Sequence, residues 1–262
     1  MNDQFKRVVK ILGDLGPLIV AYSGGVDSSL LAAVVSSNPD GKARYILLDS
    51  PLMPRRAVDE ALRIAEELGI DCEVVPFPIL DDERFCENPV DRCAVCKRAQ
   101  SSILKEIGEG AVIIDGANTS DLGEFRPGLA VSDEEGIIHP FIEAEIGKPE
   151  IREMARECGY SFRDKPSDAC LATRIPYGEP VTYEKLRIIE MGEEILRGLG
   201  LSRFRFRIHG DIARIEVPPE EFGLALAGRD EIVSAVRELG LLYATLDLAG
   251  FRSGSMDETL SL

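Results

Sequence analysis

The sequence has little positive charge and no long apolar stretch. It carries 30 lysine and arginine residues against 46 aspartates and glutamates, a formal net charge of −16. A field of this sign repels polyphosphate backbones, so stable nucleic-acid binding would need a local basic patch and is not expected. No apolar run reaches the roughly 18 residues of a membrane span, and residues 1–3 do not open a signal peptide. We therefore expect a cytoplasmic protein without a membrane partner.

The best-known phosphate-binding signatures are absent as well. The string SGGVDSS at residues 23–29 has neither the G-K-[ST] ending of a Walker A loop nor the spacing of the dinucleotide fingerprint. Ordinary kinases, GTPases and NAD-binding proteins are thereby excluded. With 262 residues, 45% of them hydrophobic, the chain is long enough for one large domain and a small one.

The string SGGVDSS lies where an apolar run at residues 18–21 meets a helical pattern. This order predicts a strand, a tight turn and a helix start, with amides and hydroxyls that suit phosphate oxygens. The alternative is a loop that only caps a helix. Asp27 is expected to act in catalysis by holding a Mg²⁺ ion that bridges the phosphates. The predicted nucleotide contacts are Ala21, Ser23, Gly24, Gly25, Val26, Asp27, Ser28 and Ser29.

Polar residues also emerge where later strand patterns end. Strand patterns at residues 43–48, 71–76 and 111–114 are separated by helical ones, which predicts an α/β fold with a parallel sheet. The carboxyl ends of parallel strands face the ligand crevice. The further candidates for contacts with the nucleotide or its Mg²⁺ are therefore Asp49, Ser50, Asp115, Asn118 and Asp121. The alternative for each group is an ordinary polar turn.

Six cysteines in a chain expected to be cytoplasmic indicate thiols or metal ligands rather than disulfides. Cys93 and Cys96 form a C-x-x-C at a helix start, where the helix dipole and basic neighbours favour thiolates, which bind soft metals. A redox dithiol and a structural pair are the alternatives. Cys170 lies in a proline-bounded loop that also carries Arg174, a candidate substrate contact. Three converging thiolates would suit a 4Fe–4S cluster with one iron open for a ligand such as sulfide.

The pattern changes after residue 183 to helix, strand, strand, helix, strand, which predicts a small α+β domain. We expect a larger domain at residues 1–175 and a smaller one at residues 176–262 for substrate binding and oligomer contacts. Strict alternation at residues 203–208 predicts three arginines on one strand face, Arg203, Arg205 and Arg207. In an acidic chain this face is expected to bind phosphate or carboxylate groups. The alternative is that it pairs with Glu216 or with a neighbouring subunit.

The string SGGVDSS resembles the pyrophosphate loop (PP-loop) of the ATP pyrophosphatases, which activate a carboxylate or carbonyl oxygen with AMP. The resemblance becomes specific with RCAVCK at residues 92–97, DGANTSDLGEFRPG at residues 115–128 and KPSDACLATRIPYG at residues 165–178. In this order the motifs resemble the LarE family of ATP-dependent sulfur transferases. The resemblance covers residues 17–217 and implies an adenine-nucleotide alpha-hydrolase-like domain with a smaller α+β domain.

The family converts pyridinium-3,5-biscarboxylic acid mononucleotide into its bisthiocarboxylic form, a step toward the nickel-pincer cofactor of lactate racemase. ATP adenylates each carboxylate, and a sulfur nucleophile displaces AMP. In one subgroup the sulfur comes from the cysteine aligned with Cys170, which becomes dehydroalanine. Another is thought to hold a 4Fe–4S cluster on three cysteines and to deliver a bound sulfide. Because Cys93 and Cys96 are present, this sequence is similar to the second subgroup.

The resemblance further implies that Arg205 and Arg207 face the substrate phosphate, that a sulfide donor is needed, and that the protein is a homo-oligomer. Two other functions remain open. One is a tRNA thiolase of the same ATP class, against which the acidic charge counts. The other is a regulatory nucleotide-binding protein whose cysteines hold Zn²⁺.

Overall fold

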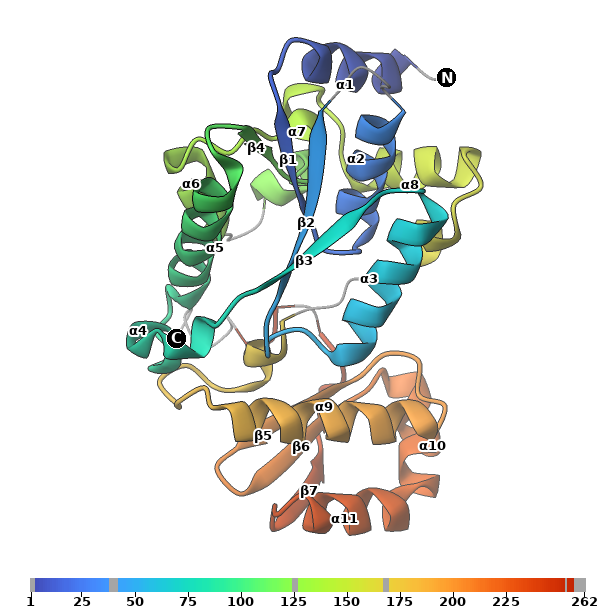
Figure 1. The fold of residues 1–262 in the computed structure, drawn as a ribbon. Helices are drawn as coiled ribbons and strands as arrows, with labels where there is room; N and C mark the ends of the chain where they lie inside the picture. The colour runs from blue at the N-terminus through green and yellow to red at the C-terminus, as the bar shows by residue number, and fades with distance from the viewer. Residues whose placement is uncertain (1–2, 38–41, 124–126, 167–169, 253, 257–262) are drawn as a thin grey trace. The chain divides into compact units, whose positions relative to one another are not determined.

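The structure, a computed structural model, describes residues 3–37, 42–123, 127–166, 170–252 and 254–256 (Figure 1). The chain divides into two compact units. Unit 1 comprises Met1–Ile79 and Asp91–Asp168, and unit 2 comprises Leu80–Val90 and Ala169–Leu262. This division differs from the expected boundary at residues 175 and 176, because residues 169–175 and an early segment belong to unit 2. None of the helices in the described ranges has the length and apolar character needed to cross a membrane.

Unit 1 is built on a four-stranded parallel sheet of order β3-β2-β1-β4. Its strands are β1 (Leu18–Tyr22), β2 (Ala43–Asp49), β3 (Cys72–Pro76) and β4 (Val112–Ile114). The chain builds outward from β1 to β3 and then returns to the other side of β1. The segments that follow β1 and β4 therefore flank a topological switch point, where ligands bind in open parallel sheets. The predicted parallel α/β fold is confirmed.

Helices cover both faces of this sheet. They are α1 (Asp3–Gly13), α2 (Val26–Ser36), α3 (Arg55–Glu67), α5 (Arg92–Gly108), α6 (Pro127–Glu134), α7 (Pro140–Glu143) and α8 (Lys148–Glu157). Helices α2, α3 and α8 lie on one face, and α5 and α6 on the other (Figure 1). The acidic run at residues 133–135 predicts a solvated loop over residues 127–136, and this prediction is wrong, because residues 127–134 form α6, which packs against α5.

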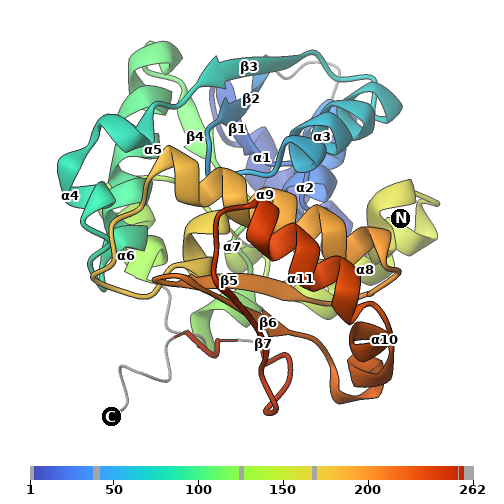
Figure 2. The same cartoon turned by 90° about the horizontal axis from the view of Figure 1, so that it is seen from below.

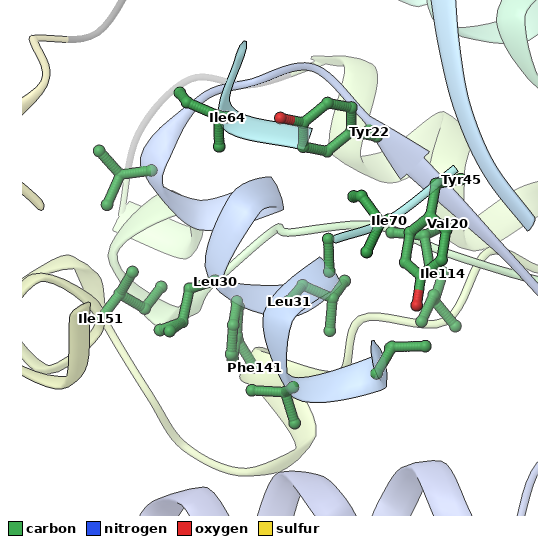
Figure 3. Packing of buried hydrophobic residues seen from close by; sticks show 14 of the residues in the cluster. Val20, Tyr22, Leu30, Leu31, Tyr45, Ile64, Ile70, Ile114, Phe141 and Ile151 are labelled. Atoms are coloured by element: carbon green, nitrogen blue, oxygen red, sulfur yellow. The ribbon is translucent and has the colours of Figure 1, made fainter. Parts of the chain in front are cut away.

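Side chains of β1 alternate between two apolar clusters. Val20 and Tyr22 enter the larger cluster with Leu30 and Leu31 of α2 (Figure 3). Ile19 enters the smaller cluster on the opposite face, which includes Leu104 of α5. A strand that is buried on both faces needs apolar residues at successive positions, which explains the unbroken run at residues 18–21.

Unit 2 is a three-stranded sheet with helices on one face (Figure 2). Its strands are β5 (Arg205–His209), β6 (Ile212–Glu216) and β7 (Tyr243–Leu246), of which β5 and β6 are antiparallel and β6 and β7 parallel. Its helices are α4 (Glu83–Cys86), α9 (Tyr183–Gly198), α10 (Phe222–Ala227) and α11 (Arg229–Glu238). The predicted order of helix, two strands, helix and strand is confirmed, with α10 as an addition.

One buried asparagine explains why residues 80–90 belong to unit 2. Asn88 is fully buried, and its Nδ2 atom lies 3.3 Å, 2.7 Å and 3.0 Å from the carbonyl oxygens of Ile175, Pro176 and Glu179. Its own carbonyl accepts a hydrogen bond from the Gly178 amide at 2.9 Å. Residues 80–90 therefore hold the loop that follows Cys170 in place through Asn88.

Candidate functional site

The turn between β1 and α2 has a backbone that glycine adopts with little strain. Gly24 has a φ of +68°, and a Cβ at this position would lie 2.3 Å from the Cβ of Ala61 in α3. Gly25 follows in an extended conformation and begins α2 without a side-chain cap. Ala21 and Val26 flank the turn, half-buried and buried respectively. The uncapped helix start is suited to an anion such as phosphate.

Serine hydroxyls stabilise this turn from within. The Oγ atoms of Ser23 and Ser28 lie 3.0 Å apart, and Ser28 Oγ donates to the Gly25 carbonyl at 3.2 Å. Ser23 is exposed, whereas Ser29 is fully buried. In this conformation the Ser23 side chain is exposed beside the uncapped start of α2, whereas the Ser29 hydroxyl is not accessible.

Asp27 is held at the turn by an asparagine from the loop after β4. Asn118 is fully buried, and its Nδ2 donates to Asp27 Oδ2 at 3.2 Å. Its Oδ1 accepts from the Ser120 amide at 3.1 Å, and its own amide donates to Asp121 Oδ2 at 3.2 Å. Asp121 is buried and pairs with Lys148 at 2.9 Å. Asn118 therefore orients the Asp27 carboxylate, as the outer-shell partner of a metal ligand does.

Gly116 brings the same loop against the first turn of α2. A Cβ at this position would lie 2.8 Å from the amide nitrogen of Ser28 and 2.9 Å from the carbonyl carbon of Asp27. A larger residue would push the two backbones apart. The sequence alone does not assign this role to Gly116, which follows the end of β4 by two positions.

Asp115 follows β4 and forms an ion pair with α5, the helix that carries Cys93 and Cys96. Its carboxylate is buried, lies 2.6 Å from His139 Nδ1, and pairs with Lys97 of α5 at 2.9 Å. Burial by itself would raise the pKa of Asp115, but the His139 hydrogen bond and the Lys97 charge outweigh it and hold that pKa well below its usual range. Asp115 is therefore a charged structural anchor in this conformation. Its contact with a nucleotide or Mg²⁺ stays a prediction.

The two histidines respond to their surroundings in opposite directions. Burial would lower the pKa of His139, but the hydrogen bond and charge of Asp115, with the charge of Asp133, raise it above 6.5. Burial, together with the charge of Arg214, lowers the pKa of His209 at the end of β5 below 6.5. His139 therefore favours the protonated form in the folded chain, and His209 favours the neutral form.

These shifts predict opposite pH dependences for two matched variants. A raised pKa adds stability that is present below 6.5 and is lost as the pH rises through the folded value, so His139→Gln should cost most at low pH. A lowered pKa makes stability fall as the pH falls below 6.5, so His209→Gln should cost less at low pH than at high pH. Urea denaturation from about pH 5.5 to about pH 8.5 measures both. Parallel profiles for the two variants would contradict the prediction.

Lys165 is a buried cation at the glycine turn. Its Nζ atom donates to the Gly24 carbonyl at 3.0 Å and pairs with Glu60 of α3 at 3.1 Å, and its side chain is 6% exposed. Arg152 of α8 donates to the Lys165 carbonyl at 3.0 Å. Lys165 thus connects the start of the KPSDACLATRIPYG motif to the PP-loop string. The sequence offers only the position of Lys165 in that motif as a signal for this role.

Asp49 and Ser50 lie at the carboxyl end of β2, as predicted. Asp49 pairs with Arg55 of α3 at 2.7 Å, and Arg55 also donates to the Ser50 carbonyl at 2.8 Å. Ser50 is buried, and its Oγ accepts from the Leu52 amide at 3.3 Å. These bonds stabilise the turn itself. In this conformation Asp49 and Ser50 therefore act as residues of an ordinary polar turn, and their contact with a nucleotide stays a prediction.

Cys93 and Cys96 occupy the first turn of α5, as predicted. Cys93 is exposed and Cys96 is half-buried. Cys170 is half-buried, belongs to unit 2, and precedes the short 3₁₀-helix η4 (Leu171–Arg174). Residues 167–169 of its loop lie outside the described residues. Thiols are the donors that iron–sulfur clusters require, but in the part of the chain that the structure describes no three His, Cys, Asp or Glu side chains are grouped to hold a metal ion.

The arginines do not form the open face expected of residues 203–208. Arg203 precedes β5, because the strand begins only at Arg205. Arg207 is 7% exposed and lies 2.6 Å from Glu216, the alternative partner considered above. Arg174 is 3% exposed and lies 2.7 Å from Glu193 of α9. Two of the three predicted substrate contacts are thus buried in ion pairs.

Arg205 differs from these two arginines. Its guanidinium lies 4.7 Å from the centre of the Phe251 ring, and its side chain is half-buried. Burial, with the neighbouring charge of Arg174, lowers the pKa of Arg205 to about 10. A cation that its surroundings disfavour gains from an added negative charge, so Arg205 is suited to an anion.

Comparison with known proteins identifies the family. An uncharacterised protein of Synechocystis sp. is 34% identical over 100% of this chain and 99% of its own length. The pyridinium-3,5-bisthiocarboxylic acid mononucleotide synthase of Lactiplantibacillus plantarum is 33% identical over 97% of this chain and 94% of that enzyme. The chain belongs to the LarE family.

Membership of the LarE family confirms the resemblance that the four motifs carry. Weaker similarity to a component of the glutamine-hydrolysing GMP synthase of Methanosarcina barkeri, 23% identical over 98% of this chain and 85% of that protein, agrees with the PP-loop fold. So does an NH₃-dependent NAD⁺ synthetase of Aeropyrum pernix, 25% identical over 76% of this chain and 78% of the synthetase. No protein-family profile matches the chain.

Proposed function

We propose that this LarE-family chain uses ATP to adenylate the carboxylates of pyridinium-3,5-biscarboxylic acid mononucleotide and replaces the AMP by sulfur, as a step in nickel-pincer cofactor synthesis. The observation that carries the proposal is the 33% identity with the synthase over 97% of the chain. Adenylation releases pyrophosphate, and sulfur attack on the acyl-adenylate releases AMP.

The nucleotide half of the reaction belongs to unit 1. The amides after Gly24 and the Ser23 hydroxyl receive phosphate oxygens at the uncapped start of α2. Asp27, oriented by Asn118, would hold a Mg²⁺ ion, which would supply positive charge beside the phosphates. The buried charge of Lys165 on the Gly24 carbonyl keeps the turn in its bent form and adds positive potential beside the phosphates.

The sulfur half of the reaction rests on Cys93, Cys96 and Cys170. Their thiolates would hold a 4Fe–4S cluster, which would supply a soft sulfur nucleophile for attack on the acyl-adenylate. The sulfide comes from a separate donor, so no cysteine is consumed. The alternative is that Cys170 gives up its own sulfur and becomes dehydroalanine.

Substrate binding and assembly belong to unit 2. Arg205 binds the phosphate of the mononucleotide, because its charge is poorly compensated by its surroundings. Large apolar side chains are exposed in this unit, among them Leu226, Leu242, Tyr243 and Leu248. Exposed apolar surface of this kind supports contacts between copies of the chain, so we expect a homo-oligomer.

Anaerobic purification, iron and sulfide analysis, and intact-mass measurement after turnover test this function. The parent protein should carry iron and acid-labile sulfide, form the thiocarboxylate repeatedly and keep its mass. The double variant Cys93→Ser, Cys96→Ser is the matched control, because it keeps Cys170 and the PP-loop; it should lose both iron and repeated turnover.

Three other results would overturn the proposal, each in favour of one alternative. Loss of the elements of H₂S from the parent protein would make Cys170 the sacrificial donor. Zinc without iron would support the regulatory protein. Tight, salt-sensitive binding of tRNA would support the tRNA thiolase.

A further inference from the structure

We propose that Thr173 and Arg174 are positioning residues that fix the backbone at Cys170, with Arg207 as a second support. The inference rests on the proposed function, because it concerns Cys170, one of the three cysteines on which the sulfur half of that reaction depends. It gives Arg174 and Arg207, which the sequence predicts as substrate contacts, a role in supporting the loop in this conformation. All of the contacts that carry it lie within unit 2.

The first support is a relay of two hydrogen bonds onto the Cys170 carbonyl. Thr173 Oγ1 donates to the Cys170 carbonyl oxygen at 2.7 Å, and the Thr173 amide donates to the same atom at 3.0 Å. Arg174 Nη1 donates to Thr173 Oγ1 at 2.6 Å. Because arginine can only donate, it occupies a lone pair of the hydroxyl and leaves the hydroxyl proton for the carbonyl. The hydrogen bonds therefore run from Arg174 to the Thr173 hydroxyl and from that hydroxyl to the Cys170 carbonyl.

Buried carboxylates hold the two arginines in place. Arg174 contacts both carboxylate oxygens of Glu193, at 2.7 Å and 3.3 Å. Arg207 contacts both oxygens of Glu216, at 2.6 Å and 3.2 Å, and donates from Nη1 to the Thr173 carbonyl at 2.5 Å. A bidentate pair fixes a guanidinium in orientation as well as in distance. Beyond its carboxylate, Arg174 donates to the Thr173 hydroxyl and Arg207 donates to the Thr173 carbonyl.

Fixing the Cys170 carbonyl limits where its sulfur can lie. Cys170 has φ −47° and ψ 130°, and bonds to its carbonyl oxygen hold ψ near this value. With the backbone fixed, Sγ is left with the few staggered χ1 positions. Cys170 must present its sulfur at one place whether it holds the cluster or, in the alternative, gives up its own sulfur. A displacement of about 1 Å in a reacting group can cost about 100-fold in rate, so a fixed cysteine favours sulfur transfer in both cases.

A pair of variants at Thr173 tests the relay. Thr173→Val removes the hydroxyl at nearly constant volume, whereas Thr173→Ser keeps it. We expect Thr173→Val to lower kcat for thiocarboxylate formation about 10-fold with KM for the mononucleotide unchanged, because a positioning role acts on the transition state. Thr173→Ser should restore kcat to within about twofold of the parent.

A second measurement is independent of sulfur transfer. Cys170 is alkylated with iodoacetamide in the full chain purified without iron, and its rate is followed by peptide mass spectrometry. The alkylation rate should change several-fold in Thr173→Val and stay unchanged in Thr173→Ser. If the valine variant does not fold, Thr173→Ala takes its place and should show the same change. Equal alkylation rates in all variants, or a raised KM with unchanged kcat, would overturn the positioning role. If the parent protein transfers no sulfur but the alkylation rates differ, the proposed function fails and the positioning role stands.

Discussion

Replacing Gly24 by alanine is expected to reduce ATP-dependent sulfur transfer by about 100-fold. The new Cβ would lie 2.3 Å from the Cβ and 2.6 Å from the Cα of Ala61, and the residue would keep a φ of +68° only under strain. Relief requires the turn to move away from α3, which displaces the amides that we propose receive the phosphates. Strain and overlap together should lower the free energy of unfolding by about 2 to 4 kcal/mol.

Gly25→Ala is the matched control for this variant. Gly25 is the next residue, has a φ of −74°, and its added Cβ would meet only Ser23 Oγ, at 3.4 Å. Kinetics at saturating ATP and urea denaturation of the two variants measure the contrast. We expect Gly25→Ala to keep its rate within about fivefold of the parent. Equal rates for the two variants would show that the αL turn at Gly24 is not needed for the reaction.

Glu216→Gln is expected to have the largest effect on the stability of unit 2. Glu216 is fully buried and lies 2.6 Å from both Arg207 and Arg214. The neutral amide would leave the Arg207 charge in a buried site without this carboxylate, while Arg214 keeps Asp247 at 2.9 Å. Breaking a buried ion pair costs about 3 to 5 kcal/mol, and we expect about 3 kcal/mol here because glutamine keeps the side-chain volume.

Hydrogen exchange of the β6 amides measures this loss within unit 2, because a chain of two units need not unfold in one step. Glu194→Gln is the control, since Glu194 pairs with Arg197 on the half-exposed surface of α9. Surface pairs contribute about 0.5 kcal/mol, so the control should hardly change exchange. A loss below about 1 kcal/mol in Glu216→Gln would mean that water or another group compensates Arg207.

Much of the fold is predictable because its signals are local. The run at residues 18–21, the turn at Gly24 and the helix after it follow from strand and turn preferences of neighbouring residues. The helix α6 is not predictable in this way. Its acidic end at residues 133–135 resembles a solvated loop, and its packing against α5 depends on residues 30 and 36 positions away.

In the candidate site too, positions with a local sequence signal are predictable and contacts between distant residues are not. The motifs locate Gly24, Asp27 and Asn118, since each lies where a strand pattern ends. They do not predict that Lys165 binds the Gly24 carbonyl or that His139 binds Asp115. These partners are 141 and 24 positions apart in the chain, so no local pattern connects them.

The sequence by itself determined the α/β alternation, the position of the phosphate-binding turn and the family, because each depends on residue types at short, regular spacings. Only the tertiary structure decided which charges meet. Arg174 and Arg207 are expected from sequence to bind substrate, yet they pair with Glu193 and Glu216 and support the Cys170 turn. A buried guanidinium must be neutralised where it lies, and which carboxylate does so depends on how the elements pack: α9 supplies Glu193 for Arg174, and the neighbouring strand β6 supplies Glu216 for Arg207.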